Sequence, residues 1–215
     1  MHKQVRHTIE SGAALTGLSS KLSRMSSGKV VFAAAALFVV FMVFVLPRQV
    51  EVSSRHLAGA GSPDMSFVYS AEQVYKWAEA YGASGRQAYV QARWTFDQAW
   101  PFAYGFFLAS AISWVGRRAY RTDSRANLLN LAPVAAVLLD YAENIATSIV
   151  MLRYPSAAPI AANFASPATV SKWILLGGSF VALLVGILAW IWRLLRGRGL
   201  RQGQQVPPGG VGTGV

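Results

Sequence analysis

An apolar segment, residues 128–152, contains two acids and an amide near its middle. Asp140, Glu143 and Asn144 follow an i, i+3, i+4 spacing, so a helix would present all three on one face. A carboxylate at the centre of a bilayer costs roughly 2.5 to 3.5 kcal/mol, so such groups are kept where they have partners inside a bundle. Paired carboxylates of this kind share a proton, hold a hard cation such as Ca²⁺ or Mg²⁺, or act as general acid and base.

Depth along the helices indicates which groups would meet these acids. At 1.5 Å per residue, Asp140 lies about 18 Å from the start of its segment. In the preceding, oppositely directed segment, Tyr104 lies about 10 Å below Asp97 and reaches the level of the acids. The predicted polar site comprises Asp97, Tyr104, Asp140, Glu143 and Asn144, with Arg86, Tyr89 or Arg93 reaching it from the preceding loop.

The elements that would position this site are membrane spans. The chain is 53% apolar and only 13% charged, which is too apolar for an ordinary soluble domain of 215 residues. A bilayer core of about 30 Å takes roughly 20 helical residues. Four nearly uncharged stretches are long enough, at 30–46, 99–116, 128–152 and 173–195. The predicted fold class is all-α: a polytopic membrane four-helix bundle within residues 30–195.

The outer loop, 47–98, carries helix signals. Ser70 begins a capping-box pattern, and Tyr69 and Val74 stand at hydrophobic-staple spacing, which predicts a helix over 71–81. Two glycines follow, and a second helical pattern then runs towards the next apolar segment. The loop is therefore expected to form a short extracytoplasmic amphipathic helical hairpin.

The net charge of +11 is unevenly distributed. Basic residues gather before the first span, between spans two and three, and after the last, whereas acids match them in the outer loop. The positive-inside rule therefore places both termini in the cytoplasm, where residues 1–29 form a basic arm, lying on the surface or disordered, and 196–215 a disordered tail. The expected partners are the bilayer and anionic lipid headgroups at the cytoplasmic face. No basic patch lies on a recognition motif, so nucleic acid is not an expected partner.

Reactive side chains are few. The chain has no cysteine, and its three histidines all lie outside the spans, which argues against thiolate chemistry, a histidine metal cage and a Ser-His-Asp arrangement in the bundle. The sequence indicates no cofactor and does not decide whether the polar site binds a metal ion. A protein without enzymatic activity is favoured over an enzyme.

The first span is expected to be an uncleaved anchor. Residues 58–60 have the small-x-small form of a signal-peptide cleavage site, which is the alternative. They lie more than ten residues beyond an apolar run that is already long enough to cross the membrane.

Three short motifs resemble uncharacterised four-span integral membrane proteins of bacteria. They are G-x-x-G-R-x-x-Y at 82–89, D-x-x-x-P-x-x-Y at 97–104 and D-Y-x-E-N at 140–144. The resemblance covers most of residues 67–192. It implies a multi-pass protein of the bacterial inner membrane and no particular activity.

Three functions remain open for the polar site. It is a structural helix-helix staple, a binding site for a proton, a cation or a small ligand, or the centre of a membrane-embedded enzyme that acts on a lipid by carboxylate acid and base chemistry. Four helices enclose a small pocket and no wide pore, so transport would require a homo-oligomer or an accessory role. The groups around Glu143 discriminate: Arg86 or Arg93 there indicates a staple, and an open cavity bounded by Asp97 and Asp140 indicates a ligand.

Overall fold

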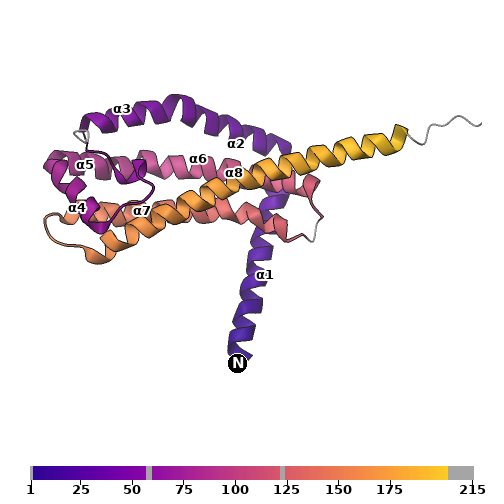
Figure 1. Cartoon of the computed structure of the whole chain (residues 1–215), viewed down its shortest axis with the longest axis horizontal. Coiled ribbons are helices and arrows are strands. Elements are labelled where there is room, and N and C mark those ends of the chain that lie inside the picture. Colours follow the sequence, from indigo (N-terminus) through magenta and orange to yellow (C-terminus); the bar gives the residue numbers. More distant parts are fainter. Residues whose placement is uncertain (1, 57–59, 122–123, 203–215) are drawn as a thin grey trace, which may run out of the picture.

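The computed structural model describes residues 2–56, 60–121 and 124–202. Every regular element within these ranges is helical, which confirms the all-α prediction (Figure 1). Most of the small-x-small motif (58 and 59) and residues 203–215 of the predicted tail lie outside the described residues.

Three stretches of the described chain are long and apolar enough to cross a membrane: Gly28–Ser53, Arg125–Arg153 and Pro159–Arg196. They correspond to the first, third and fourth predicted spans. The first consists of α2 (Gly28–Val40), a π-helical turn (Phe41–Val45) and α3 (Leu46–His56); the second of a 3-10 segment (Arg125–Leu131) and α7 (Ala132–Arg153); the third belongs to α8 (Pro159–Gln202). These stretches support a membrane protein.

The predicted second span is α6 (Phe96–Ala119), which is 24 residues long but is not among these three stretches. It carries Ser, Gly, Tyr and Trp where the others carry Val, Leu and Ile, so its hydropathy is lower. This composition suits its place in the middle of the bundle, where it contacts α1, α2, α5, α7 and α8. The count of four spans therefore stays a prediction.

Apolar side chains cover much of the outside of the bundle. Phe32 and Phe44, on the α2–α3 rod, are 77% and 60% exposed. Val181, Leu184 and Leu188, on α8, are also more than half exposed. A surface of this kind is suited to contact with lipid chains, because contiguous apolar patches are rare on soluble monomers.

The outer loop forms the expected hairpin of α4 (Ala71–Ala80) and α5 (Gly82–Arg93). The Ser70 hydroxyl caps α4 by accepting a hydrogen bond from the amide three residues on, at 3.1 Å. Gly82 turns the chain with a φ of +62°, a conformation that glycine adopts without strain. Val74 is fully buried against α7 and α8, so the hairpin covers one end of the bundle (Figure 1).

At the other end of the bundle, α1 (His2–Met25) runs across the direction of the long helices (Figure 1). The Ser19 hydroxyl donates a hydrogen bond to the carbonyl of Asn127 at 2.9 Å. The buried Asn130 amide donates to the Ser19 carbonyl at 3.1 Å and to the Ser113 hydroxyl at 2.8 Å. The described part of the predicted basic arm is thus largely helical, and it is tied to the bundle by these neutral groups and by the Arg117 guanidinium, which donates a hydrogen bond to the carbonyl of Ser26.

The start of the last long helix differs from the prediction. The span was expected to begin at residue 173, but α8 begins at Pro159, where the missing amide hydrogen is tolerated in the first turn. Small or polar residues then recur at helical spacing and bury one face: Ala162, Ala165, Thr169 and Lys172. Lys172, which directly precedes the predicted span 173–195, therefore lies within α8 and not in a loop before it.

Candidate functional site

A single buried ammonium group joins the two acids of α7. The Nζ atom of Lys172 lies 2.9 Å from Oδ1 of Asp140 and 2.5 Å from Oε2 of Glu143. Lys172 is 6% exposed and Glu143 only 1% exposed. Because a buried charge without a partner is strongly destabilising, this contact fixes α8 against α7 at one register.

Phenol groups satisfy the other carboxylate oxygens. The Tyr104 hydroxyl, on α6, donates a hydrogen bond to Oδ2 of Asp140 at 2.9 Å. The Tyr69 hydroxyl, from the residues before α4, donates to Oε1 of Glu143 at 3.2 Å and lies 2.8 Å from the Thr169 hydroxyl. Each acid is thus held by the shared ammonium on one oxygen and by a tyrosine on the other. Four separate parts of the chain meet at this cluster.

A second ion pair lies beside the first, where α5 meets α6. An Nη1 atom of Arg93 lies 2.8 Å from Oδ2 of Asp97 and donates a longer hydrogen bond, at 3.4 Å, to Asn144 on α7. The Tyr89 ring packs against the Arg93 guanidinium, 4.5 Å from ring centroid to central carbon. All four side chains are buried. Because Asn144 stands four residues after Asp140, the groups of α7 that contact the two ion pairs share one helical face.

Gly105 on α6 allows α6 to pack closely against the face of α7 that carries the acids. A Cβ atom at Gly105 would stand 2.3 Å from a methyl group of Val137 on α7, so a larger residue would force the two helices apart. Val137 is β-branched and has few rotamers in a helix, so it would not move aside easily. The close approach brings the adjacent Tyr104 within hydrogen-bonding distance of Asp140.

One predicted site residue lies elsewhere. Arg86 donates a hydrogen bond to the carbonyl of Ala78 at 2.8 Å, and its guanidinium stands 4.8 Å from the centroid of the Tyr154 ring. It is seven residues before Arg93 on α5, about 10 Å further from the carboxylates along the helix. Including Arg86 in the site was therefore wrong; it ties the hairpin together.

The other seven predicted site residues come together, but three groups at the centre were not foreseen. Lys172, Thr169 and Tyr69 supply the partners of Glu143. The recurrence of small and polar residues every three or four positions before residue 173 was the signal for Lys172 and Thr169. Neither of the outcomes named for Glu143, an arginine or an open cavity, describes what surrounds it.

The formal charges of the cluster do not cancel. Asp97, Asp140 and Glu143 would bring three negative charges, and Arg93 and Lys172 two positive ones, which leaves an excess of one negative charge if all are ionised. One proton would balance it. The space between the two acids of α7, where a metal cation would have to bind, is taken by the Lys172 ammonium. No group of three or more His, Cys, Asp or Glu in the described part of the chain is arranged to hold a metal ion.

Fold and site together define a helical membrane protein with a buried cluster of ion pairs. No family model, curated protein or solved structure matches the chain. The likeness to four-span bacterial membrane proteins thus remains an expectation that depends on its three motifs.

Proposed function

We propose that the chain is a multi-pass protein of the bacterial inner membrane whose α7 acids bind one exchangeable proton between them and Lys172. The same contacts hold α6, α7 and α8 in register. The observation that carries this proposal is the single ammonium at 2.9 and 2.5 Å from two buried carboxylates.

Four crossings and cytoplasmic termini belong to the proposal. An even number of crossings returns the chain to the side on which it began, and α6 would be the fourth. Arginines and tryptophans at one end support this orientation. Arg193 donates a hydrogen bond to the carbonyl of Ala119 at 3.0 Å. The centroids of the Trp114 and Trp190 rings lie 5.3 Å apart. Tryptophans mark a membrane interface on either side, and an excess of arginines marks the cytoplasmic one.

Charge balance supports a proton. Two acids so close together in a poorly polarisable interior repel each other, and one ammonium neutralises only one of them. The neighbouring Arg93 and Asp97 compensate each other, and the facing groups Tyr69 and Tyr104 are neutral phenols.

The enzyme alternative gains no support from this geometry. An acid or base must reach the atom whose proton it moves. Asp140 is 7% exposed and Glu143 1% exposed, and the oxygens of both are already engaged by Lys172 and two tyrosines. A binding function that also stabilises the bundle fits these contacts better.

Infrared difference spectroscopy of the chain in bilayers tests the proposal. The wild type is expected to show the C=O stretch of a protonated carboxyl at neutral pH. Glu143→Gln should lose this band, because Lys172 then balances Asp140 alone. Glu79→Gln, at an exposed acid of α4, is the matched control and should keep it. Absence of the band from the wild type, or its survival in both Glu143→Gln and Asp140→Asn, would contradict the proposal.

A further inference from the structure

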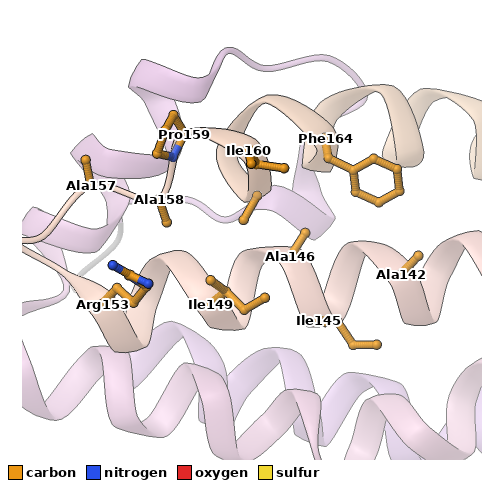
Figure 2. A pocket seen from close by; sticks show the side chains of 11 residues that line it. Ala142, Ile145, Ala146, Ile149, Arg153, Ala157, Ala158, Pro159, Ile160 and Phe164 are labelled. Carbon is orange, nitrogen blue, oxygen red and sulfur yellow. The ribbon is translucent and has the colours of Figure 1, made fainter.

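A groove of about 560 Å³ lies on the opposite side of α7 from the ion pairs, between α7 and the first turns of α8 (Figure 2). Its walls are almost entirely apolar: Ala142, Ile145, Ala146, Ile149, Ile160 and Phe164 are among the residues that line it. Figure 2 shows Ala142, Ala146 and Ile149 on α7 on one side of the groove and Ile160 and Phe164 on α8 on the other. The groove is open to the outside, where Ile160 is 88% exposed.

One charged residue lines this groove. Arg153, in the last turn of α7, stands beside Ala158 and Pro159 at one end of the groove (Figure 2). The side chain is exposed, and no acid of the described chain lies within ion-pair distance of it. A cation at one end of an apolar channel is complementary to a ligand with an anionic head and a hydrocarbon tail.

The length of the groove matches one leaflet of a bilayer. From Arg153 to Ala142 the helix rises eleven residues, or about 16 Å at 1.5 Å per residue. Half of a hydrocarbon core of about 30 Å is about 15 Å. A lipid whose phosphate rests at the membrane surface would place its acyl chain along the whole groove.

We propose that this groove binds one anionic phospholipid, with the phosphate on the Arg153 guanidinium and one acyl chain between α7 and α8. The site differs from the general attraction of anionic headgroups to the basic cytoplasmic end, because it lies at the hairpin end and seats a single chain. It requires a membrane location but not the exchangeable proton. A lipid held there would press on the back of the helix that carries Asp140 and Glu143.

A lipid fits this groove better than a second protein. A guanidinium binds phosphate through paired, charge-assisted hydrogen bonds. A protein partner would have to supply both a narrow apolar ridge and an acid, whereas the exposed face of α8 in a second copy carries bulky side chains such as Leu184 and Leu188 and no acid.

Native mass spectrometry of the full chain from detergent micelles tests this site. The probes are phosphatidylglycerol and phosphatidylethanolamine with the same acyl chains, added separately. We expect one phosphatidylglycerol to be retained in preference to phosphatidylethanolamine. Arg153→Gln should weaken its binding about five- to tenfold. Arg125→Gln removes an exposed arginine at the other end of the same span and should leave binding unchanged.

A second variant tests the apolar part of the site. Ala142→Leu fills the deep end of the groove without changing any charge, and should lower retention of both lipids. Equal retention of the two lipids by wild type and Arg153→Gln would overturn the proposal in favour of ordinary surrounding lipid. A chain that retains no lipid but forms a dimer that Ala142→Leu dissociates would overturn it in favour of a subunit interface. Unchanged melting temperatures ensure that the variants are folded.

Discussion

The two ends of the bundle use polar residues in opposite ways. At the hairpin end, Arg93 and Lys172 are buried and paired with acids from neighbouring helices. At the end where α1 joins, the arginines lie on the surface, and the buried links are neutral hydrogen bonds from Ser19 and Asn130. The first end thus holds its helices together by buried charge, whereas in the proposed topology the surface arginines of the second end would set the orientation in the membrane.

This difference has an energetic consequence. A buried ion that loses its partner costs several kcal/mol, whereas a neutral hydrogen bond contributes about 1 kcal/mol and an exposed ion pair less. The same kind of substitution should therefore have graded effects along the molecule.

Lys172→Met should destabilise the bundle most. It leaves two buried carboxylates without their common cation, at a cost of about 3 to 5 kcal/mol. The amount of folded chain in membranes and its thermal unfolding in detergent measure the loss. Adding Asp140→Asn and Glu143→Gln should restore most of it, because the triad is then uncharged. A single variant that folds as well as wild type would refute a structural role for this lysine.

Arg93→Met should come next and act locally, with a cost of about 3 kcal/mol because Asp97 loses its ion pair. Hydrogen exchange should rise in α5 and the start of α6 more than in α8. Arg86→Met is the matched control, since it removes a carbonyl bond and a ring contact outside the cluster and should cost about 1 kcal/mol. Equal losses of unfolding free energy in Arg93→Met and Arg86→Met would show that the buried ion pair contributes no more to stability than the contacts of Arg86.

Asn130→Ala tests the other end of the bundle. It removes the donor to Ser19 and Ser113, which is expected to cost about 1 to 2 kcal/mol. The effect should appear as faster hydrogen exchange in α1 with little change in the unfolding of α6 to α8. Asn127→Ala, at a neighbouring and more exposed amide, is the control. If Asn130→Ala destabilised the whole bundle and not α1 alone, this end would unfold as one cooperative unit with the ion-pair end.

Glu72→Gln should have the smallest effect. Its hydrogen bond and attraction to Lys76 lower the pKa of the Glu72 carboxyl, but both groups are exposed on α4. Because the pKa of the Glu72 carboxyl is lower in the folded than in the unfolded chain, ionised Glu72 stabilises the fold at pH values above the unfolded-state pKa. This contribution is lost as the pH falls through the folded-state pKa. Wild type should therefore hold only a slight advantage in melting temperature at neutral pH, and none in acid or high salt. A loss like that of Lys172→Met would invalidate the ranking.

Periodicity and spacing were enough to predict much of this arrangement. The i, i+3, i+4 spacing of Asp140, Glu143 and Asn144 specifies a shared face once the segment is helical, and helical rise brings Tyr104 to the same depth. The capping pattern at Ser70 located the start of α4. These features are local, so sequence alone carries them.

The missing partners depend on packing between helices. Residues 159–172 contain prolines, Ser, Thr and Asn, a composition that is typical of a loop. Only their packing against α7 shows that they form the first turns of a helix with one buried face. The Lys172 charge therefore counted towards topology and not towards the site. Tyr69 looked like a hydrophobic staple, and its ring does pack in that core, but its hydroxyl reaches Glu143 some 74 positions away. No local pattern encodes that contact.

Solid-state NMR of the chain in bilayers can detect the contact between the Lys172 ammonium and the two acids of α7. With ¹⁵N in the lysine side chains and ¹³C in the carboxyl groups, the Nζ of Lys172 should couple to two carboxyl carbons, and Asp140→Asn should leave a single carboxylate coupling, that to Glu143. The ammonium protons of Lys172 should also exchange slowly with water. A Lys172 ammonium that couples to neither acid and exchanges rapidly would contradict the account, since α8 would then not be held to α7 by charge.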